Sequence, residues 1–138
     1  MLKTVIVEDD RMVALINAQF AEKKPGLQVV ATFHNGRDAL AFLEKTRVDL
    51  LLTDLYMPEM SEIELMSELR RQGCDADVIF ITAANDASNI QDALRLGAVD
   101  YLLKPFYYER FEEALDKAVV RRKVIESGMA FTQADKDE

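Results

Sequence analysis

Four separate stretches of this sequence end an apolar run on a side chain that could do chemistry. The triplet Glu8-Asp9-Asp10 and Asp54 supply carboxylates, Thr82 supplies a hydroxyl and Lys104 an ammonium group. Carboxylates brought together repel each other by about 4 kcal/mol per pair at a separation of roughly 4 Å and an effective dielectric of about 20. Such a cluster predicts a bound cation, and all-oxygen ligation suits a hard ion such as Mg²⁺. A cation, an ammonium and a hydroxyl around one carboxylate predict phosphoryl transfer to that carboxylate.

The elements that must bring these residues together alternate between strands and helices. Short runs of branched apolar residues predict buried parallel strands over residues 3–7, 28–33, 48–54, 78–81 and 99–103. Apolar residues at helical spacing follow each of them. In the first helix this spacing predicts an inward stripe of Met12, Leu15, Ile16 and Phe20. The last helix is expected to reach about Glu126, with Arg121-Arg122-Lys123 as a solvated basic end.

This alternation predicts an α/β fold, a doubly wound five-stranded parallel sheet with helices on both faces. In the flavodoxin-like strand order 2-1-3-4-5, the strands that end near Glu8, Asp54, Thr82 and Lys104 are contiguous. The carboxyl ends of parallel strands form the ligand crevice of such sheets. We therefore expect the polar residues to meet at one edge, with Asp54 as the nucleophile because it ends the central strand.

Composition excludes several functional classes. The 138 residues carry a net charge of −8, which argues against a chain that grips nucleic acid by itself. No apolar run approaches the roughly 20 residues that span a bilayer, and no signal peptide precedes the first strand. We therefore expect one cytoplasmic domain with no membrane partner. The single Cys74, in a polar setting, is interpreted as an incidental thiol.

Four motifs in this order resemble the receiver domain of two-component response regulators. They are Val5-Ile6-Val7-Glu8-Asp9-Asp10, Leu52-Thr53-Asp54-Leu55-Tyr56-Met57-Pro58, Ile81-Thr82-Ala83-Ala84 and Asp100-Tyr101-Leu102-Leu103-Lys104-Pro105-Phe106. The resemblance covers about residues 2 to 122. Within that family the chain looks most like regulators of citrate and C4-dicarboxylate sensing, the CitB/DcuR group. This narrower likeness rests on residues 25–30, 77–86 and 106–111.

The resemblance implies a role for each site residue. Asp54 would be phosphorylated by a partner histidine kinase, while Lys104 and Thr82 contact the phosphoryl oxygens. Mg²⁺ would be held by Glu8, Asp9, Asp54 and the backbone carbonyl of Tyr56. Tyr101 would be the aromatic switch residue whose rotamer follows Thr82. The Lys104-Pro105 peptide is expected to be cis.

Two features of the pattern stay open. Ser61-Glu62 stands where family members usually have a glycine, so the backbone of that turn could differ. The acidic triplet also allows Asp9 and Asp10, rather than Glu8 and Asp9, to be the metal pair, although strand geometry favours the latter. Asp10 is expected to cap the first helix.

The sequence predicts a receiver domain over residues 1–122, followed over 123–138 by a helix end and a polar tail. We interpret that tail as the start of a linker to a DNA-binding domain absent from this chain. DNA would be contacted only through that domain, and phosphorylation is expected to produce a homodimer, because DNA readers commonly act in pairs. The chain would then regulate transcription, its own chemistry being limited to self-phosphorylation and slow autodephosphorylation.

Two other functions fit parts of the pattern. A stand-alone receiver would act through protein contacts only, and the tail past Val120 argues mildly against it. A Mg²⁺-dependent phosphatase of the haloacid dehalogenase type also uses an aspartate at a strand end. Such an enzyme needs a second aspartate two residues later as general acid, and that position is Tyr56.

Overall fold

Five strands and five helices make up the described part of the chain in the computed structural model, which covers residues 1–54, 60, 62–83, 90–95 and 97–137. Within these ranges the side chains of residues 62, 63, 82, 83, 90, 92, 93 and 126–137 are not described. The elements in chain order are β1 (Leu2–Val7), α1 (Arg11–Glu22), β2 (Leu27–Phe33), α2 (Gly36–Lys45), β3 (Leu50–Asp54), α3 (Glu62–Arg71), β4 (Asp77–Ala83), α4 (Ile90–Arg95), β5 (Ala98–Lys104) and α5 (Tyr108–Asp137).

The strands form one parallel sheet in the order β2-β1-β3-β4-β5. The predicted fold and strand order are confirmed. In the ladders Val7 lies beside Thr53, and Asp54 lies beside Ile81. The carboxyl ends of β1, β3, β4 and β5 therefore meet at one edge of the sheet, as the distribution of polar residues requires.

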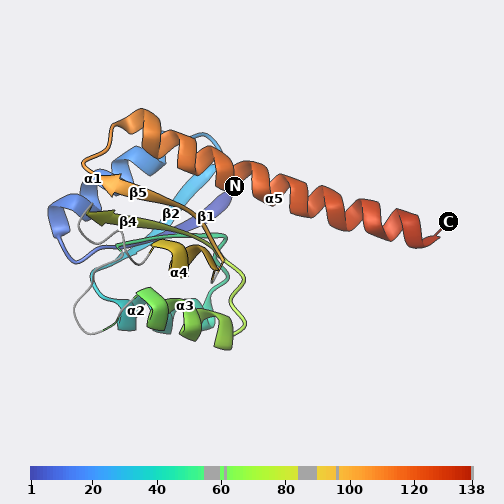
Figure 1. Ribbon diagram of the computed structural model, residues 1–138, viewed down its shortest axis with the longest axis horizontal. Coiled ribbons are helices and arrows are strands. Elements are labelled where there is room, and N and C mark those ends of the chain that lie inside the picture. The colour runs from blue at the N-terminus through green and yellow to red at the C-terminus, as the bar shows by residue number, and fades with distance from the viewer. Residues whose placement is uncertain (55–59, 61, 84–89, 96, 138) are drawn as a thin grey trace.

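Helices cover both faces of the sheet, with α1 and α5 on one face and α2 and α3 on the other (Figure 1). Side chains of a strand alternate between the faces, so Leu51 joins the apolar cluster under α2 and α3 while Leu50 and Leu52 join the cluster under α1 and α5. All five residues of β3 are buried. This double burial explains why β3 is apolar from Leu50 to Leu52 and carries its one charged side chain, Asp54, at its end.

The predicted inward stripe of α1 is wrong for three of its four residues. Met12, Leu15 and Ile16 are 65%, 54% and 41% exposed, and only Phe20 packs against the core. The helix instead buries Ala14, Asn17 and Ala21. These small residues let α1 lie close to the sheet and to α5. The polar Asn17 interrupts the apolar pattern of the buried face. The sequence pattern therefore pointed to the face of Met12, Leu15 and Ile16, which is more hydrophobic but exposed.

The last helix is longer than predicted, because α5 continues to Asp137 instead of ending near Glu126. No proline interrupts residues 108–137, and the single Gly128 costs only about 1 kcal/mol relative to alanine. Figure 1 shows the carboxyl half of α5 extending clear of the globular part of the molecule. None of the helices, within the part that the structure describes, has the length and apolar character needed to cross a membrane.

The prediction that Arg121 and Arg122 are merely solvated is also wrong. Both donate from Nε to the buried carboxylate of Asp77, at 3.0 and 3.1 Å. Arg122 Nη2 also donates to the backbone carbonyls of Asp49 (3.0 Å) and Asp75 (2.8 Å). The side chain of Arg122 is only 11% exposed, so these hydrogen bonds are largely shielded from water. They hold α5 against the amino ends of β3 and β4.

We predict that Arg122→Ala destabilises the fold by about 2–3 kcal/mol, because it removes a charged donor from the carbonyls of Asp49 and Asp75 and from the Asp77 carboxylate. The Asp49 carbonyl keeps one other donor, the backbone N–H of Asp77 at 3.0 Å. Urea unfolding measures this loss. Lys123→Ala, at the exposed neighbouring position, is the matched control and should cost no more than about 0.5 kcal/mol. Equal stabilities of the two variants would show that the contact does not stabilise the fold.

Candidate functional site

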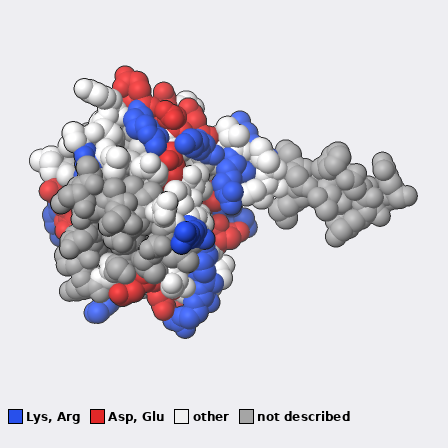
Figure 2. All heavy atoms as spheres, viewed as in Figure 1, with Lys and Arg blue, Asp and Glu red and all other residues white. Residues whose placement is uncertain are grey.

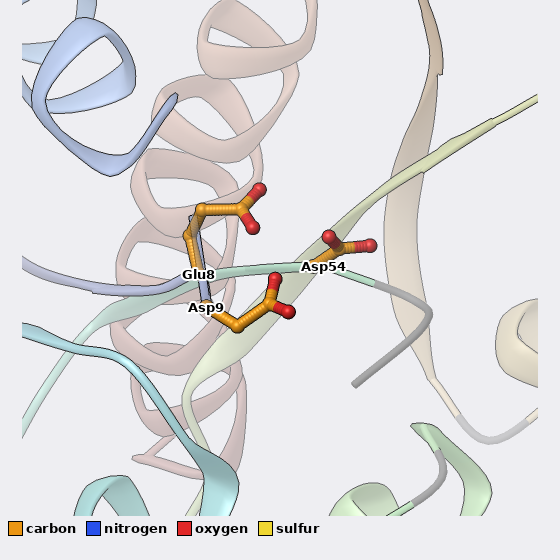
Figure 3. Close-up of side chains that lie close together, drawn as sticks. All are labelled: Glu8, Asp9 and Asp54. Carbon is orange, nitrogen blue, oxygen red and sulfur yellow. The ribbon is translucent and has the colours of Figure 1, made fainter. Parts of the chain in front are cut away.

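Three carboxylates converge at the carboxyl edge of the sheet. Glu8 and Asp9 follow β1 directly, and Asp54 is the last residue of the neighbouring strand β3. One carboxylate oxygen from each of the three lies within 4.8 Å of the other two. Figure 3 shows the side chains of Glu8, Asp9 and Asp54 directed toward a common point.

Lys104 brings a positive charge to the same edge from the end of β5. Its Nζ lies 3.2 Å from Asp54 Oδ2 and 3.3 Å from Glu8 Oε1. Partial burial lowers the pKa of Lys104, but the negative charges of Asp54 and Glu8 and its hydrogen bonds to them outweigh this and raise the pKa above its ordinary value. The ammonium group therefore stays charged beside Asp54. The peptide that follows, Lys104-Pro105, is cis, as predicted.

Glu8 is the most strongly perturbed acid of the cluster. Glu8 is 2% exposed. Burial raises its pKa to about 7, and a hydrogen bond shared with the Asp9 side chain is the next largest cause. The charge of Asp54 acts in the same direction, whereas the Asp10 backbone N–H and Lys104 lower the pKa. That N–H donates to Glu8 Oε2 at 3.1 Å. Glu8 is thus held in place but resists ionisation unless a further positive charge is present.

Asp10 points away from this cluster and caps α1. Its Oδ1 accepts hydrogen bonds from the backbone N–H groups of Met12 (3.0 Å) and Val13 (3.1 Å), which are free donors at a helix start. The geometry therefore favours Glu8 and Asp9 as the metal pair and leaves Asp10 a structural role.

His34 is a neighbour of the site that the sequence did not indicate. Its Nδ1 lies 2.9 Å from the backbone carbonyl of Glu8, and because a carbonyl only accepts, Nδ1 must carry the hydrogen. The backbone N–H of Glu8 donates to the carbonyl of Phe33 at 2.9 Å. The turn after β2 thus fixes the backbone from which Glu8 and Asp9 project. The spacing between residues 8 and 34 gave no local signal for this contact.

A second ion-pair network fixes β5 next to Tyr101. The buried carboxylate of Asp100 accepts hydrogen bonds from Arg110 and from the N–H of Tyr101, and it pairs with Lys117. Burial raises the pKa of Asp100, but these donors outweigh it and hold the pKa below its ordinary value. Arg110 also donates to the carbonyl of Tyr101 at 2.9 Å. Tyr101 itself is half-buried against the core.

Three predicted features lie wholly or partly outside the described residues. The backbone of Thr82 pairs with Leu103 between β4 and β5, which places it at the same edge, but its side chain is not described. Tyr56 and Ser61 are outside the described ranges, as is the side chain of Glu62. The roles assigned to Thr82 and Tyr56 therefore stay predictions.

The donor set is chemically suited to a divalent cation. Three carboxylates within reach of one ion, with no sulfur or nitrogen ligand among them, provide the oxygen ligands that hard cations prefer. Burial is the main cause of the raised pKa of Glu8, and the charge of Asp54 adds to it, so a bound cation would favour the ionised form of this carboxylate. The cluster Glu8, Asp9 and Asp54 could therefore hold a metal ion.

Comparisons with known proteins agree with this geometry. The sequence profile of the response regulator receiver domain matches residues 4–116. The chain is 39% identical over 137 residues to the transcriptional regulatory protein MalR of Bacillus subtilis, covering 99% of this chain and 58% of MalR. It is 37% identical over 140 residues to the transcriptional regulatory protein DcuR of Escherichia coli K12, covering 100% of this chain and 59% of DcuR. The chain thus spans under two thirds of these relatives.

Solved structures give the same result. The receiver domain of AraT, a response regulator of Geobacillus stearothermophilus, superposes with a TM-score of 0.82 at 30% identity, covering 91% of this chain and 98% of that one. A response regulator receiver domain from Clostridium thermocellum gives a TM-score of 0.80 at 25% identity, covering 91% and 99%. The predicted likeness to the CitB/DcuR group is confirmed by the match to DcuR. This chain belongs to the response regulator receiver domain family.

Proposed function

We propose that this chain receives a phosphoryl group on Asp54 from a sensor histidine kinase and passes the signal on through a change in its surface. The observation that carries this proposal is the position of Asp54, at the end of the buried β3 and 3.2 Å from Lys104 Nζ, with Glu8 and Asp9 beside it. In the transfer an Asp54 carboxylate oxygen forms a bond to phosphorus as the bond from phosphorus to the kinase imidazole nitrogen breaks. The chain acts as a signalling domain whose only chemistry is to take up and slowly lose this group.

Each residue of the site has a separate part in this transfer. Glu8, Asp9 and Asp54, with the carbonyl of Tyr56, would hold Mg²⁺, which when bound screens the negative charge of the incoming group. Lys104 contributes a fixed charge that attracts a phosphoryl oxygen. The Thr82 hydroxyl donates to another, and its movement lets Tyr101 turn inward, which is a change of packing at the surface.

The output of the domain is proposed to be transcriptional. The similar proteins MalR and DcuR are described as transcriptional regulatory proteins, and this chain spans under two thirds of each. We propose a receiver domain over residues 1–122 and a linker over residues 123–138, with DNA bound by a further domain. On phosphorylation the face formed by α4, β5 and α5 would pair with that of a second copy. Exposed ion pairs contribute little, so this contact should be weak in the isolated domain.

The kinase is proposed to dock on α1. Met12, Leu15 and Ile16 form an exposed apolar patch on the first turns of this helix, which begins directly after the acidic triplet. A protein that delivers a phosphoryl group to Asp54 must approach the same edge of the sheet. Large apolar side chains left exposed in a group commonly mark a protein interface.

Acetyl phosphate with Mg²⁺ is predicted to add one phosphoryl group, and Asp54→Asn should abolish this addition because an amide is not a nucleophile of the required kind. Intact mass measures the addition. The control is Asp75→Asn, an exposed acid at the opposite edge of the sheet, which should label normally. Stoichiometric labelling of the Asp54→Asn variant would show that another residue is the acceptor.

Mg²⁺ binding is predicted to weaken as the pH falls through 7, because a proton on Glu8 competes with the ion. With a pKa of about 7 the ionised fraction of Glu8 falls about tenfold between pH 8 and pH 6, and the affinity should fall with it. Titration calorimetry measures both affinities, and Glu8→Gln should remove the dependence of the affinity on pH.

Asp9→Asn is predicted to weaken Mg²⁺ binding much more than its neighbour Asp10→Asn, as the same titration measures. A larger effect at Asp10 would shift the metal pair by one residue.

Leu15→Glu is predicted to slow phosphotransfer from a histidine kinase that phosphorylates the wild type by at least about tenfold, because it places a charge in an apolar contact. Labelling by acetyl phosphate should be unchanged, since a small donor needs no docking surface. Ala41→Glu, an equivalent change at an exposed position on α2, is the matched control. Equal kinase rates for all three proteins would remove α1 as the docking site.

A further inference from the structure

The short loop that carries Glu8 and Asp9 is held on both sides. Before it, the N–H of Glu8 donates to the carbonyl of Phe33 at 2.9 Å, which continues the pairing of β1 with β2 past the last residue of β1. After it, the carbonyl of Asp10 accepts a hydrogen bond from the N–H of Ala14 at 2.9 Å, in the first turn of α1. The peptide unit that joins Glu8 to Asp9 therefore lies between two fixed points.

One rotation remains open to this peptide unit. A planar peptide can turn about the line between its two Cα atoms, because opposite changes in ψ of Glu8 and φ of Asp9 compensate each other. The rotamers open to a side chain depend on its backbone angles, so this turn would redirect the Asp9 carboxylate. The Glu8 carboxylate is less sensitive, because the Asp10 N–H (3.1 Å) and Lys104 Nζ (3.3 Å) also hold it. Asp9 is exposed, so less of its surroundings can correct a change in direction.

The imidazole of His34 fixes this rotation. Its Nδ1–H donates at 2.9 Å to the carbonyl of Glu8, which is the oxygen of the peptide between Glu8 and Asp9. In the part of the chain that the structure describes, no backbone N–H donates to that oxygen. The chain turns away after His34, where the Asn35 side chain caps α2 by accepting from the N–H of Asp38 at 2.8 Å. A single side chain thus sets the orientation of the peptide that links the two acids.

The freedom of the Asp9 carboxylate decides which divalent ions the site can hold. Mg²⁺ requires near-ideal octahedral ligands at about 2.0–2.1 Å, whereas Ca²⁺ accepts a flexible arrangement at about 2.3–2.6 Å. A fixed ligand set suits the stricter requirement of Mg²⁺, and a ligand set that is free to turn loses Mg²⁺ before Ca²⁺. Surface charge makes no such distinction, because the acidic and basic side chains on the face drawn in Figure 2 act alike on two ions of equal charge.

We propose that His34 is a positioning residue of the metal site, and that its hydrogen bond to the peptide between Glu8 and Asp9 gives this site a preference for Mg²⁺ over Ca²⁺. The inference rests on the proposed function, because that function makes Glu8 and Asp9 ligands of the ion. His34 acts through the peptide and therefore on Asp9, from a turn 26 residues further along the chain than Glu8. Removal of a partner that orients a metal ligand commonly weakens metal binding about 10- to 100-fold.

Substitutions at position 34, each titrated with Mg²⁺ and separately with Ca²⁺ in a calorimeter, test the role of the donor. His34→Leu removes the donor and should raise the Mg²⁺ dissociation constant at least about tenfold, and the Ca²⁺ dissociation constant much less. His34→Asn is the matched control, because the Asn amide nitrogen is bonded to Cγ as Nδ1 is in His, and Leu has the same branched shape as Asn. This variant should bind both ions nearly as the wild type does. His34→Gln places its amide one bond further out and should resemble the Leu variant.

The outcomes separate this inference from the proposed function. Circular dichroism without divalent ions verifies that each variant is folded. A His34→Leu variant that binds Mg²⁺ as tightly as the wild type, equal losses for the two ions, or an Asn variant as weak as the Leu variant would each overturn the role of His34. A wild type that binds neither ion overturns it as well. A wild type that binds Mg²⁺ but takes no phosphoryl group from acetyl phosphate contradicts only the proposed function, because the titrations involve no phosphoryl transfer.

Discussion

Mutual repulsion among the carboxylates of Glu8, Asp9 and Asp54 is the constraint on which the rest of this structure depends. Their oxygens lie within 4.8 Å of one another, and Glu8 is nearly inaccessible to solvent. Such crowding is tolerated only when positive charge is nearby. Lys104 supplies part of it, and the pKa of Glu8 is nevertheless raised to about 7, mainly by burial and further by the charge of Asp54. The cluster could therefore hold a cation.

The parallel sheet is what makes that crowding possible. Neighbouring parallel strands end at the same edge, so residues far apart in sequence become neighbours with little local distortion. The central strand β3 is buried on both faces, which fixes the position of Asp54 relative to β1 and β4. Two hydrogen bonds also fix the backbone position of Glu8. Its N–H donates to the carbonyl of Phe33, and its carbonyl accepts from the His34 ring. The free energy of the apolar core thus holds an arrangement of charges that would not assemble alone.

The two helices on the α1 and α5 face show how a fold can leave apolar surface outside. On α1 the small residues Ala14 and Ala21 make the close contact, while larger side chains such as Leu15 stay exposed near the site. On α5 the inner stripe joins the core and the outer valines remain uncovered. In both cases the exposed apolar residues lie where a second protein can reach them.

The sequence alone was sufficient for the strands, their order and the meeting of Asp54, Glu8 and Lys104. Short apolar runs that end on polar residues are local signals, and the rules of parallel sheets place their ends together. Only the tertiary structure decided that Asn17 faces inward on α1 and that Arg122 binds Asp77, 45 residues away. Helical periodicity reveals an apolar stripe but not which stripe meets the sheet. Ion pairs between distant elements leave no periodic pattern, because they depend on how the packed helix lies on the strands.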